Sequence, residues 1–318
     1  MKRNLIKVFT VIICIFLLLI AASSVFFGHM VAEQVLHPNR GVDTHDNSVK
    51  QLAKWGYDLD GFMTRYTGEE ISAEAEDGNI VPATYFSADS DTCVVLVHGA
   101  GGDRVSVYPL AEAYLQRGYD VIALDQRGCG ANPDEEVTFG IDEALDVRAM
   151  VTYARTELGA ENVLVHGQSM GGQTAALYAS GVTPGEVNAA DAVICDSPVP
   201  GMEYMVRSVI GEDEEGTDSS LCDYLIATSN LYMKLFYGVE YAEGDTIAQV
   251  AMNKLPMLII VSDQDEVCLP HMVEKIYDNI TYEAKEIQYV NGGHIEGIIN
   301  DPEGYMNGVE GFLNTIGF

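Results

Sequence analysis

The strongest constraint on the fold of this chain is a repeated alternation of short apolar runs with longer amphipathic segments. The apolar runs, rich in Val, Ile and Leu, occupy residues 93–97, 120–124, 163–166, 192–195 and 257–261. Strands that are buried on both faces have this composition, and the segments between them have helical periodicity. The pattern therefore predicts an α/β domain with a doubly wound, mainly parallel sheet.

Further runs define the two ends of the predicted sheet. A run around Ile71 and another at residues 80–86 flank a turn-forming sequence at 76–79, and together they predict an antiparallel hairpin at the start of the domain. A last run at 286–290 precedes a predicted helix over about 301–313. Because reactive groups in parallel sheets gather at the carboxyl ends of the strands, we expect the functional residues in the loops after them.

The N-terminal segment has the character of a membrane span. Lys2, Arg3 and Lys7 precede 21 uncharged residues, 8–28, which are enough to cross a bilayer. We expect residues 1–28 to be a signal anchor or a signal peptide, and the length of the apolar run favours the anchor. The basic residues then place the N-terminus in the cytoplasm and the remaining chain outside, on the cell membrane. Cleavage near the small residues 21–24 is the alternative and would give a secreted protein.

Beyond this segment the chain is strongly acidic. Residues 29–318 hold 14 of the 17 basic residues and all 48 acidic residues, which gives a formal charge of −34. Such a surface repels polyanions, so nucleic acid is excluded as a partner. The expected partners are the membrane, through the N-terminal helix, and a small substrate.

The remaining chain divides into a linker and one large domain. Residues 29–67 are expected to be a polar linker, and residues 68–318 the α/β domain. Residues 198–252 form an insertion between two predicted strands, with an acidic run at 211–218. Apolar side chains in the insertion fall on neighbouring helical positions: Leu231, Tyr232, Leu235 and Phe236. This helix fits either a lid over a substrate pocket or a helix packed on the sheet, and the sequence leaves both open.

A candidate nucleophile lies between a predicted strand and a predicted helix. Residues 167–172 read Gly-Gln-Ser-Met-Gly-Gly and follow the apolar run at 163–166. A sharp turn at that place forces the serine into a strained conformation with an exposed hydroxyl, and glycines leave room around it. The context predicts Ser169 as a nucleophile, with a helix-capping serine as the alternative.

A serine nucleophile needs a base, and the base needs an acid that orients it. His294 follows the run at 286–290 in the sequence Asn-Gly-Gly-His and is the predicted base. The loop after residues 257–261 offers Asp263, Asp265 and Glu266 as the acid. The order serine, acid, histidine is that of the α/β-hydrolases.

The negative charge that develops on an attacked carbonyl oxygen requires backbone N–H donors. Residues 98–102, His-Gly-Ala-Gly-Gly, follow the run at 93–97 and allow close approach of the backbone. The predicted donors of this oxyanion hole are the N–H groups of Ala100 and Met170, the residue after the nucleophile.

Together these motifs resemble the α/β-hydrolase superfamily over about residues 68–316. The segments that carry the resemblance are 98–102, 125–130, 167–172, 196–198 and 292–294. More narrowly, the chain is similar to membrane-anchored or exported serine hydrolases of Gram-positive bacteria, which in turn are similar to carboxylesterases and to the catalytic domain of prolyl oligopeptidases. The resemblance implies that Asp125 and Arg127 fix their loop. Cys129 stands where the family has histidine, so it receives no catalytic role.

The family's spacing leaves two candidates for the acid. Counting forward from Ser262 gives Asp265, and counting back from Pro270 gives Glu266, because this loop is one residue longer. We favour Asp265, since distance from the strand end determines where a carboxylate can point. Asp263 lies closest to the strand and fits a structural role.

The expected activity is hydrolysis of a carboxylic ester through an acyl-enzyme on Ser169, without a cofactor. No metal site is expected, because the five cysteines beyond the N-terminal segment include no CxxC pair. A peptidase or amidase of the prolyl-oligopeptidase type, acting on a short peptide, is the first alternative. A non-catalytic binding protein on the same scaffold is the second.

Overall fold

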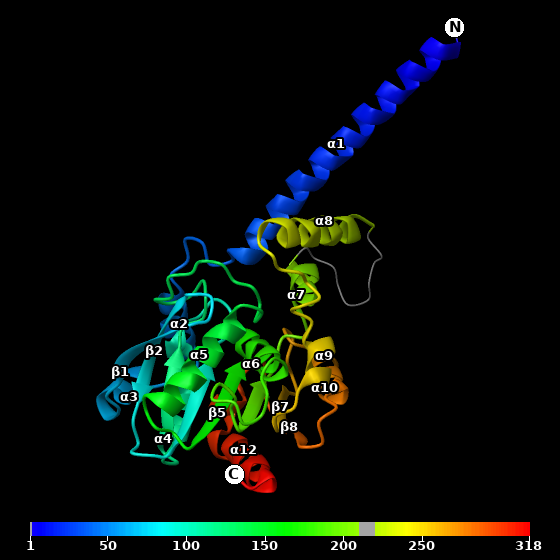
Figure 1. Cartoon of the computed structure of the whole chain (residues 1–318). Coiled ribbons are helices and arrows are strands. Elements are labelled where there is room, and N and C mark those ends of the chain that lie inside the picture. Colours follow the sequence, from blue (N-terminus) through cyan, green and yellow to red (C-terminus); the bar gives the residue numbers. More distant parts are fainter. Residues whose placement is uncertain (1, 210–219) are drawn as a thin grey trace.

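An eight-stranded sheet lies at the centre of the molecule within residues 2–209 and 220–318, which the computed structural model describes (Figure 1). The strand order is β1-β2-β4-β3-β5-β6-β7-β8. The strands are β1 (Glu69–Glu74), β2 (Ile80–Phe86), β3 (Thr92–Val97), β4 (Asp120–Leu124), β5 (Asn162–Gln168), β6 (Ala192–Asp196), β7 (Met257–Ser262) and β8 (Lys285–Val290). β1 and β2 form the predicted antiparallel hairpin, and β3 to β8 are parallel. The predicted doubly wound, mainly parallel sheet is confirmed.

Helices cover both faces of the sheet. Within the described residues of the α/β domain they are η1 (Arg104–Val107), α4 (Tyr108–Leu115), α5 (Glu143–Thr156), α6 (Met170–Ser180), α10 (Pro270–Asn279), α11 (Gly297–Asn300) and α12 (Pro302–Ile316). Alternate residues of β3 face opposite sides, which explains its continuous apolar sequence. Cys93 and Val95 join the core under α5 and α6, whereas Val94 and Leu96 join the core under α4 and α12.

The segment expected to be a polar linker is folded onto the domain, which corrects that prediction. It contains α2 (Thr44–Lys54) and α3 (Leu59–Arg65), each capped by an aspartate that precedes it. Leu52 and Phe62 are completely buried. Phe62 packs against the rings of Phe86 and Tyr108. The hydroxyls of Ser48 and Thr44 also accept hydrogen bonds of 2.9 Å from the N–H groups of Asp103 and Gly130. The polar composition of the segment does not reveal these contacts.

The N-terminal helix α1 (Lys2–Leu36) is continuous and longer than the uncharged stretch (Figure 1). Its outer part is exposed and apolar, and the helix is long and apolar enough to cross a membrane. Its last two turns enter the main core, where Ala32 and Leu36 are completely buried. The carbonyl oxygen of Leu36 also accepts a hydrogen bond of 2.7 Å from the N–H of Val137. The base of α1 is therefore part of the globular domain.

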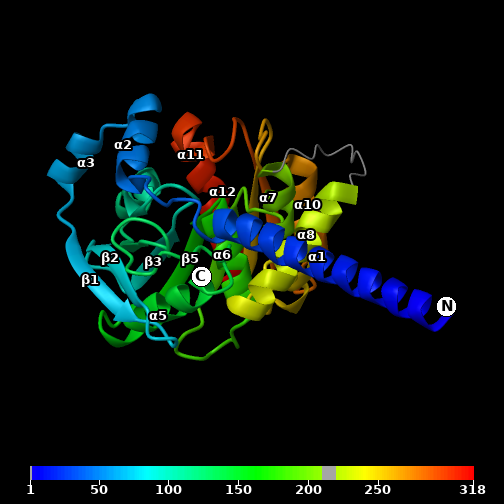
Figure 2. The same cartoon turned by 90° about the horizontal axis from the view of Figure 1, so that it is seen from above.

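The insertion at 198–252 extends from the base of α1 to helices α6 and α10. It contains α7 (Met202–Val209), α8 (Ser220–Phe236), α9 (Thr246–Gln249) and η2 (Val250–Met252). The acidic run at 211–218 lies outside the described residues. Figures 1 and 2 show α8 packed against α1. Gly28 permits this contact, because a Cβ there would lie 2.5 Å from the carbonyl oxygen of Thr228. Of the predicted apolar positions, Leu231, Leu235 and Phe236 are exposed.

Candidate active site

Ser169 occupies the turn between β5 and α6 in a conformation that serine rarely adopts. Its φ is 59° and its ψ is −121°. The turn is possible because a Cβ on Gly167 would lie 1.9 Å from the carbonyl oxygen of Gly171, and a Cβ on Gly171 would lie 2.1 Å from that of Val97. The Ser169 side chain makes no capping hydrogen bond to α6. Its hydroxyl therefore points away from the helix that it precedes.

The three predicted side chains meet at the carboxyl edge of the sheet. His294 Nε2 lies 2.7 Å from Ser169 Oγ, and His294 Nδ1 lies 2.8 Å from Asp265 Oδ2. The second oxygen of Asp265 accepts hydrogen bonds of 2.8 Å from the N–H groups of Val267 and Cys268. Each residue comes from a different loop, after β5, β7 and β8. The arrangement fixes the imidazole with Nδ1–H toward the carboxylate and Nε2 free to accept the serine proton.

The two other acidic candidates lie elsewhere. Asp263 accepts a hydrogen bond of 3.0 Å from the N–H of Gly292 and thereby supports the loop before His294. Residue counting leaves Asp265 and Glu266 open as the acid. In the structure Asp265 contacts His294, whereas Glu266 is exposed to solvent.

Asp265 is held in its ionised form. Burial, the largest single influence, raises the pKa of this carboxyl group, but the hydrogen bond and charge of His294 lower it. The N–H groups of Cys268 and Val267 act in the same direction, and the net pKa lies below its ordinary value. A carboxylate rather than a carboxylic acid therefore faces the imidazole.

The predicted oxyanion donors lie close to the serine hydroxyl. A Cβ on Gly99 would lie 3.1 Å from Cβ of Ser169, so the loop before Ala100 runs directly beside the nucleophile. Among residues 2–209 and 220–318, the backbone N–H groups of Ala100 and Met170 have no protein acceptor. Met170 begins α6, where the first N–H groups of a helix have no partner within it. Both donors are available to a substrate oxygen.

Comparison with known proteins agrees with this geometry. A family model described as the alpha/beta hydrolase fold matches residues 92–218. The chain has the α/β-hydrolase fold. Its structure is similar to that of the esterase Pf2001 of Pyrococcus furiosus, with a TM-score of 0.63 and 20% identity, over 81% of this chain and 95% of the esterase. At this identity the likeness concerns the fold.

Two bacterial sequences are similar to this hydrolase over most of their length. A thermostable monoacylglycerol lipase of Bacillus sp. strain H-257 is 29% identical over 214 residues, which cover 64% of this chain and 82% of the lipase. An uncharacterized protein of Bacillus subtilis strain 168, YqkD, is 22% identical over 231 residues, or 72% of this chain and 73% of the relative.

An apolar pocket of about 260 Å³ adjoins the candidate oxyanion hole of the hydrolase. Ala100 and Met170 are among the residues that line it. Most of the other lining residues are apolar and come from the loop before α5, from α7 and from the base of α1, among them Phe139, Met205 and Val35. An apolar cavity lined in part by the proposed carbonyl-binding residues is suited to the acyl part of a substrate.

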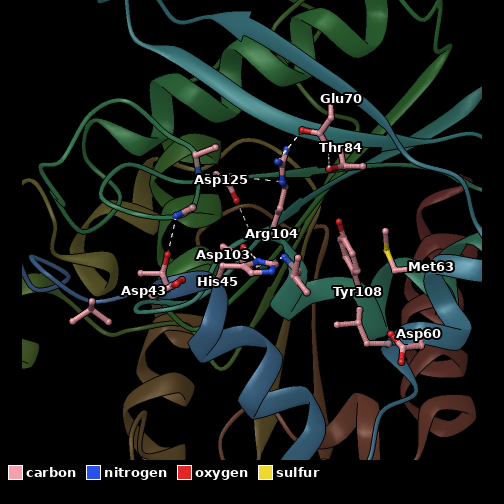
Figure 3. Close-up of a pocket in the computed structure, with 16 residues that line it drawn as sticks. Asp43, His45, Asp60, Met63, Glu70, Thr84, Asp103, Arg104, Tyr108 and Asp125 are labelled. Carbon is pink, nitrogen blue, oxygen red and sulfur yellow. Dashed lines mark hydrogen bonds and ion pairs between the residues drawn. The ribbon is translucent and has the colours of Figure 1, made fainter.

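A second pocket of about 580 Å³ is larger and has more charged residues in its lining (Figure 3). Arg104 lies in it between Glu70, at 2.8 Å, and Asp125, at 3.6 Å. His45 and Asp103 form another pair at 2.8 Å. Ser169 and His294 do not line this pocket, and its basic groups, Arg104 and His45, are each paired with acidic residues of the pocket. It does not belong to the site of the candidate chemistry.

Several residues of the family motifs hold the hydrolase scaffold together. The guanidinium of Arg127 pairs with Asp77, Asp134 and Asp146. Asp125 accepts hydrogen bonds of 2.9 Å from the N–H groups of Arg104 and Ala131. These contacts agree with the loop-fixing role implied by the resemblance.

The remaining motif residues are unsuited to proton transfer. Burial raises the pKa of the Cys129 thiol to about 12, so it is not a reactive thiolate. His166, hydrogen-bonded to Tyr114 and Tyr305, has its pKa lowered to about 3 by burial. Burial likewise lowers the pKa of His98, whose Nε2 accepts the N–H of Gln126 at 3.0 Å.

Proposed function

We propose that this hydrolase cleaves a carboxylic ester through an acyl-enzyme on Ser169. The observation that carries the proposal is the unbroken hydrogen-bonded series from Ser169 through His294 to Asp265. A serine hydroxyl becomes a useful nucleophile when a neighbouring imidazole accepts its proton and a carboxylate stabilises the resulting imidazolium.

In the first half of the proposed reaction, Ser169 Oγ attacks the ester carbonyl carbon and its proton passes to His294 Nε2. The carbonyl oxygen becomes negative and accepts hydrogen bonds from the N–H groups of Ala100 and Met170. When the tetrahedral intermediate collapses, the C–O bond to the alcohol breaks. His294 returns its proton to the alkoxide, and the alcohol leaves.

In the second half, a water molecule takes the place of the alcohol. His294 Nε2 accepts a proton from this water as its oxygen attacks the acyl carbon. Collapse breaks the bond to Ser169, which regains its proton from the imidazolium, and the carboxylic acid is released. These residues complete the cycle without a cofactor.

An ester is preferred over a peptide for two reasons. The pocket beside the oxyanion donors is mainly apolar, which suits an acyl chain. A curated sequence relative of stated activity is a monoacylglycerol lipase. A peptidase or amidase would share Ser169, Asp265 and His294, and it becomes the conclusion if amides are cleaved and esters are not.

We further propose that the hydrolase is anchored in the cell membrane by α1, with the catalytic domain on the outer side. The uncharged residues 8–28 support a span, and the basic residues before them support this orientation. Residues 68–318 then form the catalytic domain, with 198–252 as an insertion. Cleavage of the segment and secretion is the competing outcome.

The test uses Ser169→Ala in the full chain, with Ser180→Ala as the matched control on the same helix. We expect Ser169→Ala to lose both turnover of p-nitrophenyl esters and labelling by a fluorophosphonate, with an unchanged circular dichroism spectrum. Ser180, whose hydroxyl bonds the carbonyl oxygen of Ala176 at 2.8 Å, should be dispensable. A folded wild type that neither reacts with the probe nor hydrolyses esters or amides would indicate a non-catalytic binding protein.

A further inference from the structure

The base of the N-terminal helix forms part of the apolar pocket. Val31, Gln34 and Val35 of α1 line it together with Ala100 and Met170. The same cavity is thus lined both by the residues of the proposed oxyanion hole and by the continuation of the apolar N-terminal helix. A side chain on this part of α1 can contact whatever occupies the pocket.

This wall is fixed rather than adjustable. Val31 and Val35 are 5% and 9% exposed, and they lie one helical turn apart on the face toward the pocket. The adjacent turn is held by the buried Leu36. The carboxylate of Glu33 accepts a hydrogen bond of 2.9 Å from the hydroxyl of Tyr237, which follows α8. The pocket shape therefore depends on how α1 docks.

The same helix sets the height of the pocket relative to a membrane. Val31 and Val35 follow the uncharged stretch 8–28 by three and seven residues, which at about 1.5 Å per residue is roughly 5 and 10 Å along the helix. The polar headgroup layer of one leaflet is about 5–8 Å thick. With residues 8–28 in the bilayer core, the pocket lies at the level of the lipid headgroups.

The insertion presents apolar side chains at this level too. α8 contacts α1 where Gly28 meets Thr228 and where the ring of His29 meets Tyr232. Leu235 and Phe236, near the end of α8, are 67% and 64% exposed. In Figure 1, α8 lies across the base of α1 at the edge of the globular part. These side chains lie where a leaflet surface would contact the domain.

From this geometry we propose that α1 supplies one wall of the acyl-binding pocket and that the substrate is a lipid ester taken from the surrounding leaflet. The inference rests on the proposed ester hydrolysis at Ser169 and names its substrate class. A volume of about 260 Å³ holds part of one acyl chain rather than a whole lipid. The formal charge of −34 on residues 29–318 disfavours anionic headgroups, so we expect an alcohol part without net negative charge, as in an acylglycerol.

The first experiment changes the size of the pocket by substituting Val35, a residue of α1 that lines it. Full-length protein in phosphatidylcholine vesicles is assayed on monooleoylglycerol and on p-nitrophenyl acetate. Val35→Trp should reduce the ratio of kcat/KM for the oleoyl ester to that for the acetyl ester by about tenfold or more. Val35→Ala should move this ratio less, or in the opposite direction. Met30→Trp, at an exposed position of the same helix, should leave the ratio unchanged.

Fluorophosphonate labelling of Ser169 separates this inference from the proposed function. If labelling and acetate hydrolysis fail in the wild type, the proposed function is wrong. If both succeed but Val35→Trp, Val35→Ala and Met30→Trp share one chain-length preference, α1 is not a wall of the acyl pocket. The wall assignment is also wrong if Val35→Trp lowers kcat/KM equally for the oleoyl and the acetyl ester while Val35→Ala leaves the ratio of the two values unchanged.

The second experiment tests delivery from the leaflet. The mole fraction of monooleoylglycerol in the vesicles is varied at constant total concentration. We expect the rate to follow the mole fraction in the bilayer. A rate that depends only on the total concentration would overturn delivery from the membrane and leave a water-soluble ester as the substrate.

Discussion

At the scale of single residues, the backbone of Ser169 is strained, with a φ of 59°. A non-glycine residue held at positive φ costs on the order of 1–3 kcal/mol, which the surrounding structure must offset. Here the N–H of Ser169 donates to the carbonyl oxygen of Asp196 at 2.9 Å, and Gly167 and Gly171 admit the neighbouring carbonyls. This strained backbone conformation directs the Ser169 hydroxyl toward His294.

The acid is tested by a pair of isosteric substitutions. Asp265→Asn should lower kcat on an ester by about three to four powers of ten, because the imidazole loses its orientation and its correct tautomer, as it does when the acid of a serine protease triad is changed to asparagine. Glu266→Gln should remain within about twofold of the wild type, since Glu266 is exposed. Steady-state kinetics on one p-nitrophenyl ester measure both. A large loss of kcat for Glu266→Gln, with Asp265→Asn close to the wild type, would identify Glu266 as the acid.

The sequence could narrow the acid to two residues but could not decide between them. Counting from either end of the loop gives a different answer, because one extra residue can be accommodated anywhere along it. The position of the Asp265 carboxylate is fixed by a local turn, in which the N–H groups of Val267 and Cys268 donate hydrogen bonds to it. Such a local turn depends on backbone dihedral angles, and residue spacing does not specify it.

The lowered pKa of Asp265 predicts a pH-dependent contribution to stability. A carboxyl group whose folded pKa lies below its unfolded value of about 3.9 stabilises the fold above that value, and loses this contribution as pH falls through the folded pKa. The difference in unfolding free energy between wild type and Asp265→Asn should therefore be constant above about pH 5 and shrink below about pH 4. Urea denaturation in detergent micelles at several pH values measures it. A difference that grows toward acid pH would contradict the assignment.

At the scale of elements, the helices before the sheet were the part that the sequence did not reveal. α2 and α3 were expected to be a linker because most of their residues are polar, yet Leu52 and Phe62 are completely buried. Asp43 and Asp58 cap them through the N–H groups of Asp46 and Gly61. Two short helices that each bury one large apolar side chain have too little apolar periodicity to be distinguished from a polar loop. The strands of the sheet, by contrast, were recognisable from their uninterrupted apolar runs.

The docking of α1 predicts that its last turn stabilises the whole domain. Leu36→Ala should lower the free energy of unfolding by about 2–5 kcal/mol, because a completely buried leucine is replaced by a cavity. Leu221→Ala on α8, where the side chain is 63% exposed, is the matched control and should change it by less than about 0.5 kcal/mol. Chemical denaturation in micelles measures both. Equal effects would mean that α1 is only an appendage.

At the scale of the whole molecule, the sheet, its hairpin and the loops that carry the site followed from the sequence. Alternating strands and helices leave few topologies, and parallel strands bring their carboxyl ends to one edge. The contact between the N-terminal helix and the insertion did not follow. Gly28 and Thr228 are 200 residues apart in the sequence, and no pattern in either segment identifies the other as its partner.

Membrane anchoring is tested on the intact protein in its host or in a heterologous bacterium. We expect the hydrolase to remain with the membrane fraction after a high-salt wash and to be released by detergent, because residues 8–28 are held by the hydrophobic effect rather than by charge. N-terminal sequencing completes the test. A soluble protein whose mature N-terminus lies between residues 22 and 30 would establish a cleaved signal peptide instead.

Because α1 is continuous from Lys2 to Leu36, the thickness of the bilayer affects the orientation of the whole molecule. A helix whose apolar stretch exceeds the local hydrocarbon thickness tilts, and it becomes upright as the bilayer thickens. Since the last turns of α1 are embedded in the core with no hinge between them and the span, any such tilt turns the whole domain with it. The acyl-chain lengths of the surrounding lipids thereby set the angle at which the pocket mouth meets the leaflet.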